Sequence, residues 1–387
     1  MDSRPVYATQ RGFIEPLEGL RAVAAIGIIF THTAFQTGLP LNSIFARFDF
    51  FVPVFFALSA FLLWRRYGTE LVKPVEVRRA TVAYYLSRAA RILPAYLVLV
   101  IGVFLTLPAT FGAPLRQVVA NLMLTQIYVP GALAPGLTHL WSLCVEVAFY
   151  LVLPGLTLLM RGRSTRCRLA ILLGLVVLSF GWPFLAFVQA TPANGWPNLQ
   201  IFPISYACWF AIGIGAAELE GKVQSRLGAP GRLGCWALAL VVAWVAAQPW
   251  FGPLGLAHPH PMEFVRRLLA GAVFAALFLL PHAWAAPGCR SRVLSSPAFQ
   301  HLGRWSYGIF LWHLPVLTWV FPLLGRAPFS GGFLVVSALT VLATIPIAAA
   351  SYEFVERPAA RFLRSLSTPR GSTTAPRDTQ HATALNH

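Results

Sequence analysis

Ten apolar runs, each long enough to cross a membrane, constrain the fold of this chain more than any other feature of its sequence. A membrane-spanning helix needs about 20 mainly apolar residues, because the hydrocarbon core of a bilayer is about 30 Å thick. With 57% hydrophobic and only 11% charged residues, the chain also has too few charges to cover a soluble domain of 387 residues. The sequence therefore predicts an all-α, polytopic transmembrane helical bundle of about ten helices. The runs lie approximately at 17–36, 44–64, 92–110, 140–160, 169–189, 201–218, 233–251, 268–286, 306–324 and 332–353.

The distribution of basic residues predicts how these helices are oriented. If both termini are cytoplasmic, 24 of the 30 Lys and Arg residues fall inside, five fall outside, and Arg21 lies within the first span. The positive-inside rule gives such an asymmetry for an even number of spans. We therefore expect a multi-pass protein of the bacterial inner membrane, with both ends in the cytoplasm.

Neither the net charge nor the cysteines indicate a different class of protein. The net charge is +17, but the basic residues form short clusters between apolar runs rather than one continuous basic face. We therefore expect the lipid bilayer, and no nucleic acid, as the partner that explains the charge. The five cysteines show no spacing typical of a zinc site or a disulfide framework. We expect no metal ion and no permanently bound prosthetic group.

The chain divides into one membrane domain and a short tail. We assign residues 1–364 to an integral-membrane domain and expect residues 365–387, rich in Ser, Thr, Pro and Arg, to be a disordered cytoplasmic tail. The apolar stretch 118–129 is too short to span comfortably, so we expect a re-entrant or interfacial segment there. The first apolar run lacks a convincing cleavage site, so we expect it to remain as a span.

Two ionisable residues, Arg21 and His32, lie within the first apolar run, eleven residues apart. On a helix this separation returns to within roughly 20° of the same direction, about 16 Å further along the axis. Ionisable side chains inside a bilayer are costly and usually face a protein interior or a wet cavity, so the pair indicates a functional site. A neutral imidazole can take a proton from a hydroxyl as a general base. The alternative is a His32 hydrogen-bonded to a neighbouring helix and an Arg21 that extends to the headgroups.

Arg88 and Arg91 lie where the third span leaves the predicted cytoplasmic side. Because they are three residues apart, they share one helix face, an arrangement that suits the binding of phosphates. The alternative is that both residues simply anchor the helix at the membrane surface.

Glu146 and His313 are further candidates within predicted spans. Glu146 lies in the outer half of the fourth span, at a depth comparable with His32, where its carboxylate could orient the imidazole. The alternative is a structural pair between Glu146 and an arginine. His313 lies about two turns into the ninth span, and a core histidine hydrogen-bonded across helices is an equally good interpretation.

Taken together, these stretches resemble the acyltransferase 3 family of integral-membrane acyltransferases. Six motifs between residues 13 and 360, in the expected order, carry the resemblance. They are Arg21-x10-His32, Phe55-Phe56-Ala57-Leu58-Ser59-Ala60-Phe61-Leu62, Arg88-x-x-Arg91-Ile-x-Pro-x-Tyr96, Trp141-Ser142-Leu143-x-x-Glu146-x-x-Phe149-Tyr150, Ser306-Tyr307 with His313, and Glu356-Arg357-Pro358. Two positions depart from the family pattern, since Pro53 stands where many members have an acidic residue and Ala60 replaces a usual glycine.

The resemblance implies ten helices and the transfer of an acyl group, usually acetyl from acetyl-CoA, to a hydroxyl of a sugar, polysaccharide or secondary metabolite. On this chain it would make His32 the catalytic base and Arg21 its partner in the site. Arg88 and Arg91 would contact the acyl-CoA donor, and Glu146 would take the place of the acidic group missing at Pro53. The residues expected to bind substrate or support the site are Trp141, Ser142, Tyr307 and His313.

The acceptor and the order of chemical steps leave alternatives. The compact length and the Arg- and Ala-rich composition resemble the macrolide 3-O-acyltransferases of antibiotic producers, which implies the 3-hydroxyl of a macrolide lactone as acceptor. A cell-envelope sugar or polysaccharide is the alternative acceptor for the same fold. A proton-coupled exporter of an amphipathic metabolite, with Arg21, His32 and Glu146 as its relay, is an alternative of another class. Direct transfer and a covalent step through His32 or Ser142 are both compatible with the sequence.

Overall fold

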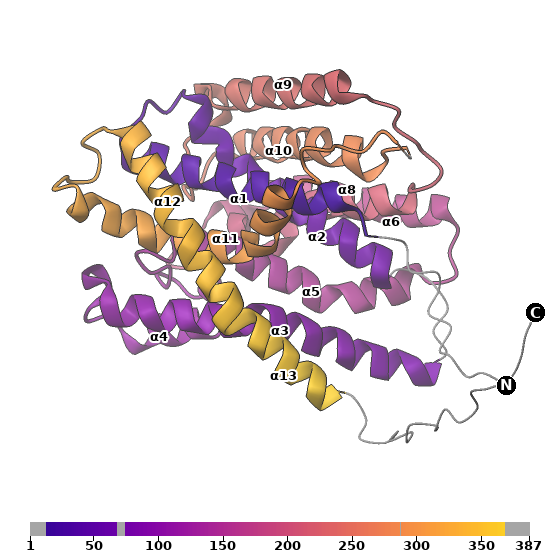
Figure 1. Ribbon diagram of the computed structural model, residues 1–387, viewed down its shortest axis with the longest axis horizontal. Helices are drawn as coiled ribbons and strands as arrows, with labels where there is room; N and C mark the ends of the chain where they lie inside the picture. Colours follow the sequence, from indigo (N-terminus) through magenta and orange to yellow (C-terminus); the bar gives the residue numbers. More distant parts are fainter. Residues whose placement is uncertain (1–12, 68–73, 287, 368–387) are drawn as a thin grey trace, which may run out of the picture.

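The structure, a computed structural model, describes residues 13–67, 74–286 and 288–367. Within these ranges the chain is helical, with two isolated β-bridges and no longer strand. Nine helical segments of the described chain are long and apolar enough to cross a membrane, which confirms the predicted all-α membrane bundle (Figure 1). They contain α1 (Glu15–Gln36), α2 (Phe51–Tyr67), α3 (Pro74–Thr106), α5 (Trp141–Met160), α6 (Thr165–Gly181), α9 (Ala229–Ala246), α10 (Pro261–Ala283), α11 (Pro297–Leu323) and α12 (Phe333–Ser351).

The predicted sixth span is a short buried helix rather than a long one. Helix α8 (Ala207–Glu218) has twelve residues, which is about 18 Å of helix. It follows two 3₁₀ turns, Leu199–Ile201 and Pro203–Tyr206. Pro203 has no N–H to donate and begins the second turn, so the apolar run does not continue as one helix. Most of α8 is buried among its neighbours, above all α2.

The connection between α3 and α5 contains one short helix, α4 (Leu115–Leu122). One side of α4 is held by the buried Asn121, whose Nδ2 donates to the carbonyl oxygens of Gln117 and Ala132 at 2.8 and 2.7 Å. The other side exposes Leu115 and Val119. Eight residues do not cross a membrane, and the exposed apolar side is the one that an interfacial segment would turn to the lipid.

Helix α1 packs at the centre of the bundle, between α2 and α11 and beside α12 (Figure 1). Glycines allow the close approach: a Cβ at Gly27 would lie 2.1 Å from the ring of Phe51, and one at Gly303 would lie 2.2 Å from the carbonyl oxygen of Glu18. Small residues at helix contacts are typical of membrane bundles. A Cβ at Gly213 would meet Ala57 and Ala60 in the same way, so α8 approaches α2 closely although Ala60 is not glycine.

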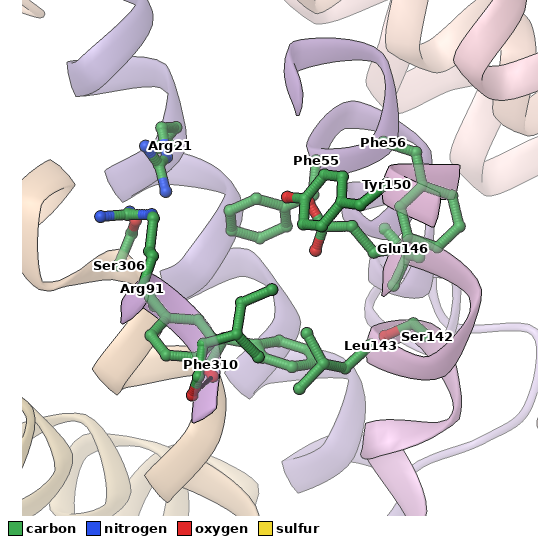
Figure 2. Close-up of a pocket in the computed structure, with 13 residues that line it drawn as sticks. Arg21, Phe55, Phe56, Arg91, Ser142, Leu143, Glu146, Tyr150, Ser306 and Phe310 are labelled. Atoms are coloured by element: carbon green, nitrogen blue, oxygen red, sulfur yellow. Dashed lines mark hydrogen bonds between the residues drawn. The ribbon is translucent and has the colours of Figure 1, made fainter. Parts of the chain in front are cut away.

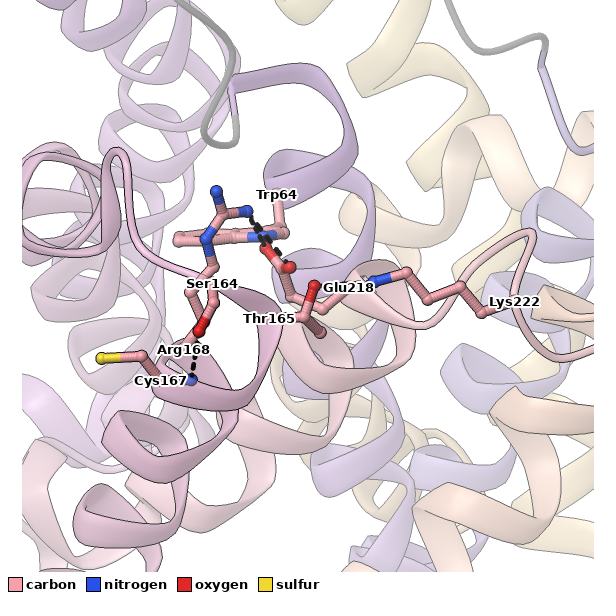
Figure 3. A network of polar contacts seen from close by, with 7 residues as sticks. All are labelled: Trp64, Ser164, Thr165, Cys167, Arg168, Glu218 and Lys222. Carbon is pink, nitrogen blue, oxygen red and sulfur yellow. Dashed lines mark hydrogen bonds and ion pairs between the residues drawn. The ribbon is translucent and has the colours of Figure 1, made fainter.

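Charged side chains fasten three helix ends together at one end of the bundle (Figure 3). Glu218 at the end of α8 accepts from Trp64 Nε1 at 2.7 Å and pairs with Arg168 of α6 at 3.1 Å. Arg65 of α2 pairs with Glu220 at 2.7 Å. The end of α2, the start of α6 and the end of α8 therefore meet. All three are predicted to lie on the cytoplasmic side of the membrane, and that orientation stays a prediction.

The C-terminal end of the described chain continues along the bundle as helix. A π-helical turn, Tyr352–Glu356, joins α12 to α13 (Arg357–Ser367), and Figure 1 shows the two as one long yellow helix that reaches α3. The predicted tail begins at residue 365, but α13 continues to Ser367. Residues 368–387 lie outside the described residues, as do Arg4, Arg11 and Lys73.

Candidate active site

A partly enclosed cavity lies where α1, α2, α3, α5 and α11 converge (Figure 2). It has a volume of about 60 Å³. Its polar lining combines two guanidinium groups, one carboxylate and several hydroxyls, and its other walls are aromatic or aliphatic. The lining residues are Arg21, Val52, Phe55, Phe56, Arg91, Ile92, Ser142, Leu143, Glu146, Tyr150, Ser306, Tyr307 and Phe310.

The two arginines lie on the same side of the cavity, where Figure 2 shows their side chains next to each other. Arg21 is paired with Glu18, one turn earlier on α1, with the two charged groups 3.7 Å apart. Arg91 makes no ion pair within 4 Å in the part of the chain that the structure describes. A guanidinium with no carboxylate within ion-pair distance can direct its N–H donors at an anion such as a phosphate.

The carboxylate of Glu146 lies across the cavity from the arginines, beside Tyr150. The Tyr150 hydroxyl donates to Glu146 Oε1 at 2.5 Å and lies 2.8 Å from the Ser59 hydroxyl. The Arg88 guanidinium carbon lies 5.9 Å from the centre of the Tyr150 ring, within the range of a cation–π contact. Arg88 therefore reaches the site through Tyr150 and does not line the cavity.

Three histidines from three elements gather next to the cavity. His32 comes from α1, His139 from the 3₁₀ turn Thr138–Leu140 before α5, and His313 from α11. The ring centres of His32 and His313 are 5.1 Å apart, and those of His139 and His313 are 4.8 Å apart. His139 and His313 are buried, whereas His32 is partly exposed.

Backbone carbonyls fix the protons on two of these rings. His139 Nε2 donates to the carbonyl oxygen of Leu311 at 3.1 Å, and His313 Nδ1 donates to that of Phe310 at 2.7 Å. A carbonyl only accepts, so the other nitrogen of each neutral ring carries a lone pair. His139 Nδ1 and His313 Nε2 are buried and have no hydrogen-bond partner among the described residues. The cluster therefore contains two unpartnered proton acceptors beside His32.

Phe310 and Ser142 connect the cavity to the histidine cluster. Both residues line the cavity. The Phe310 ring lies 5.2 Å from that of His139, and the Ser142 hydroxyl donates to the His139 carbonyl oxygen at 3.2 Å. An anion-binding cavity and a group of proton acceptors are thus neighbours, separated by one aromatic ring.

The carboxyl group of Glu356 is a further buried ionisable group at this site. It is 4% exposed, and its Oε1 has no hydrogen-bond partner among the described residues. Arg91 and Arg21 are the cations that act on it. The structure places Glu356 near the two arginines of the cavity.

The structure brings five of the predicted site residues to the cavity: Arg21, Arg91, Ser142, Glu146 and Tyr307. The predicted contact between Glu146 and His32 is not formed, because the carboxylate accepts from Tyr150 while His32 packs against His139 and His313.

The two aromatic residues predicted to support the site differ in position. The Tyr307 hydroxyl donates to the carbonyl oxygen of Ile92 at 2.8 Å, so Tyr307 joins α11 to α3 at the cavity wall. Trp141 does not line the cavity, and its ring packs against Tyr206 with ring centres 5.1 Å apart.

The sequence analysis assigns no site role to His139, Tyr150 or Phe310, although Tyr150 closes the motif that begins at Trp141. Tyr150 follows Glu146 by four residues, which is a helical contact distance and a usable signal. His139 lies two residues before the start of α5, where it reads as part of a loop, and nothing in the sequence indicates that it meets α1 and α11. Within the described residues, no group of three or more His, Cys, Asp or Glu side chains is placed to hold a metal ion.

Comparisons with known proteins give the family to which this site belongs. Residues 14–352 match the acyltransferase domain of the acyltransferase 3 family. The chain is 26% identical over 90% of its length to the peptidoglycan O-acetyltransferase OatA of Listeria monocytogenes. It is 28% identical over 80% of its length to the acyltransferase MdmB of Streptomyces mycarofaciens, and 25% identical over 89% to the O-acetyltransferase OatA of Staphylococcus aureus.

These relatives differ in how much of their own length the chain covers. It spans 80% of the Streptomyces protein but only 56% and 57% of the Listeria and Staphylococcus proteins. No solved structure matches the chain.

Proposed function

The chain belongs to the acyltransferase 3 family, and from that premise we propose that it is a membrane O-acyltransferase that moves a short acyl group, acetyl foremost, from acyl-CoA to a hydroxyl of a macrolide. One observation carries the proposal. A cavity with two guanidinium groups and a carboxylate adjoins three imidazoles. Cations that can bind a polyanionic donor therefore lie next to bases that can accept the proton of a hydroxyl.

The donor binds through the arginines. CoA carries several phosphates, and guanidinium groups bind phosphates through two parallel hydrogen bonds. Arg91 makes no ion pair within 4 Å among the described residues, Arg21 lies beside it, and Arg88 lies behind Tyr150. Arg21 and His32 are about 16 Å apart along α1. The long pantetheine arm of CoA spans this distance, so the thioester lies at the imidazole while the phosphates lie at the arginines.

His32 is the base of the transfer step. It takes the proton of the acceptor hydroxyl while that oxygen attacks the thioester carbonyl carbon. The new C–O bond forms, the C–S bond breaks, and its electron pair goes to sulfur. The CoA thiolate then takes the proton from the imidazolium, so an ester and free CoA leave and the neutral enzyme is regenerated. His139 and His313 stabilise the imidazolium, because each offers a ring nitrogen with a free lone pair.

The size of the cavity leaves most of the donor outside it. Its volume is about 60 Å³, whereas one water molecule needs about 10 to 15 Å³ on the same measure. A phosphate group at the two guanidinium groups is of this size, so the pantetheine arm with the thioester extends out of the cavity toward His32. The acceptor presents its hydroxyl from outside the cavity, at the side of the histidine cluster.

The macrolide acceptor is the finer part of the proposal. It is supported by the resemblance to macrolide 3-O-acyltransferases and by the 80% coverage of the Streptomyces relative. The identity to two O-acetyltransferases, one of them named for peptidoglycan, favours a cell-wall sugar as the second candidate acceptor.

Acyl transfer from radiolabelled acetyl-CoA, in membranes that contain the overproduced chain, tests the function. A 16-membered macrolide and a muramyl-containing peptidoglycan fragment are offered as separate acceptors. Labelled macrolide ester supports the proposal as stated, and labelled fragment alone replaces the acceptor with the cell-wall sugar. If neither acceptor nor any other hydroxyl compound is labelled with acetyl-, propionyl- or butyryl-CoA, the proposed donor and reaction are wrong.

A further inference from the structure

The C-terminal end of the described chain has one side that no other described element covers. Helices α12 and α13, with the π-helical turn between them, run as one long helix that contacts α3 (Figure 1). The segment Phe333–Phe362 is long and apolar enough to cross a membrane, and it has 30 residues. A bilayer requires only about 20. The last turns of this helix therefore reach the headgroup region.

The exposed side of this long helix changes in chemistry along its length. Leu342 and Ile347 of α12 are exposed and apolar, which suits contact with lipid tails. Phe354 is 81% exposed, and the exposed Arg357 and Arg361 follow it. Arginines near the end of a membrane helix extend their charged groups to the headgroups. This side therefore leaves the acyl chains near Phe354.

The exposed side chains of α13 lie together on one side of the helix. Arg357, Pro358, Arg361 and Phe362 are exposed, and at about 100° per residue they fall within an arc of roughly 140°. Arginines beside exposed aromatic rings are typical of a helix that lies at a membrane surface, where the guanidinium groups reach phosphates and the rings reach the acyl chains. We call Phe354, Arg357, Pro358, Arg361 and Phe362 the α13 face.

The α13 face carries positive charge. Arg357 pairs with Glu353, one turn earlier, and its side chain stays 45% exposed. Arg361 makes no ion pair within 4 Å in the part of the chain that the structure describes. The complement of such a face is a negatively charged surface with apolar material beneath it. A leaflet that contains anionic phospholipids has this composition.

The opposite side of the same segment belongs to the arginine-lined cavity. Glu356, in the π-helical turn, is buried, and Arg91 and Arg21 are the cations that act on it. π-Helical turns within longer helices are often found at functional sites. A contact that holds α13 at the membrane surface therefore also holds Glu356 beside the two arginines.

We propose that the α13 face docks on the headgroups of anionic phospholipids at the predicted cytoplasmic surface, with Arg357 and Arg361 on the phosphates and Phe354 and Phe362 among the acyl chains. The docked helix keeps Glu356 at the cavity. Lipid docking is independent of the proposed function, and only its effect on the binding of the acyl donor rests on that function.

The experiment uses the purified full chain in nanodiscs of phosphatidylcholine alone, or of an equal mixture of phosphatidylcholine and phosphatidylglycerol. Hydrogen exchange of the α13 amides, read by mass spectrometry, reports how firmly the helix is held. The variants are Arg361→Glu, which reverses the charge, and Arg361→Lys, which keeps it. Arg166→Glu is the matched control, because Arg166 is an exposed arginine in the first turn of α6, outside the α13 face. The KM for acetyl-CoA is measured in the same nanodiscs.

We expect the α13 amides of the wild type to exchange about fivefold more slowly in the mixed nanodiscs, which is the scale of one arginine near an anionic surface. Arg361→Glu should abolish this difference, whereas Arg361→Lys and Arg166→Glu should retain it. Salt at about 1 M, where the Debye length is about 3 Å, should remove most of it. The KM for acetyl-CoA should be lower in the mixed nanodiscs by up to the same factor, except in Arg361→Glu.

Three results would overturn the docking. These are equal exchange of wild-type α13 in the two lipids, an unchanged difference in Arg361→Glu, or an equal loss in Arg166→Glu, which would assign the effect to general surface charge. Slower exchange in the mixed nanodiscs with equal KM values would leave the docking and remove its effect on the cavity. If exchange follows the expectation while the wild type transfers no acyl group to any acceptor in either lipid, the docking stands and the proposed function fails.

Discussion

At the scale of single residues, the sequence predicts which side chains face inward better than it predicts their partners. The spacing of Arg21 and His32 predicts one inward face of α1, and the structure has Arg21 at the cavity and His32 in the adjoining cluster. The partner of Glu146 was predicted wrongly because contacts between helices depend on their relative height and rotation. Periodicity within one helix does not encode these quantities. The contact between Glu146 and Tyr150 lies within α5, and its i to i+4 spacing does predict it.

Arg91→Ala tests the donor role at this scale. Loss of a charge-assisted hydrogen bond costs about 1.5 to 3 kcal/mol, so we expect the KM for acetyl-CoA to rise roughly ten- to a hundredfold. Arg304→Ala, an exposed arginine of α11 away from the cavity lining, should leave it unchanged. Equal KM values in the two variants would remove Arg91 from the donor site.

Glu146→Gln separates a catalytic from a structural carboxylate. The amide oxygen can still accept from Tyr150, so the fold should persist, but the negative charge opposite Arg21 and Arg91 is lost. We expect kcat to fall at least about tenfold, on the scale of one lost charge-assisted contact, with little change in melting temperature. Full activity in a stable variant would leave Glu146 with a structural role alone.

At the scale of helices, hydropathy locates the spans because a bilayer demands long apolar runs, and nine of the predicted runs correspond to long helices within the described chain. The predicted run 201–218 does not, since hydropathy does not register that Pro203 starts a separate 3₁₀ turn before the short α8. Helix contacts are equally invisible to hydropathy. The contact between Gly303 and Glu18 that holds α11 against α1 requires a glycine at one particular position.

Gly303→Ala tests whether the contact between α1 and α11 positions the site. The new Cβ would lie 2.2 Å from the Glu18 carbonyl oxygen, and such overpacking typically costs about 1 to 3 kcal/mol. Because Glu18 and Arg21 are one turn apart on α1, we expect both the melting temperature and acyl transfer to fall. Gly174→Ala, where no atom lies within 4 Å of the new Cβ, is the control. Wild-type behaviour of Gly303→Ala would mean that the two helices can separate without cost.

At the scale of the whole molecule, the bundle follows from the sequence, whereas its site comes from distant segments. The cavity joins residues of five helices, and the histidine cluster joins residues 32, 139 and 313. No local pattern brings such positions together. The alternation of basic loops does predict which helix ends meet, and the ion pairs of Arg65 and Arg168 lie at one such meeting point.

Reporter fusions test the predicted orientation. With 24 basic residues inside and five outside, a fluorescent protein fused after His387 should be bright, and alkaline phosphatase fused there should be inactive. The same phosphatase inserted after Gly112, in the predicted outer connection, should be active. The reverse pattern at both positions would place the termini outside.

The central claim is that the histidine cluster beside the arginine-lined cavity performs acyl transfer, and His32→Ala tests it most directly. Acetyl transfer from labelled acetyl-CoA is measured in membranes that contain equal amounts of wild type, His32→Ala and His301→Ala, an exposed histidine of α11. The account predicts a loss of at least about a hundredfold for His32→Ala, as expected for a missing general base, and wild-type rates for His301→Ala. Undiminished transfer by His32→Ala would contradict it.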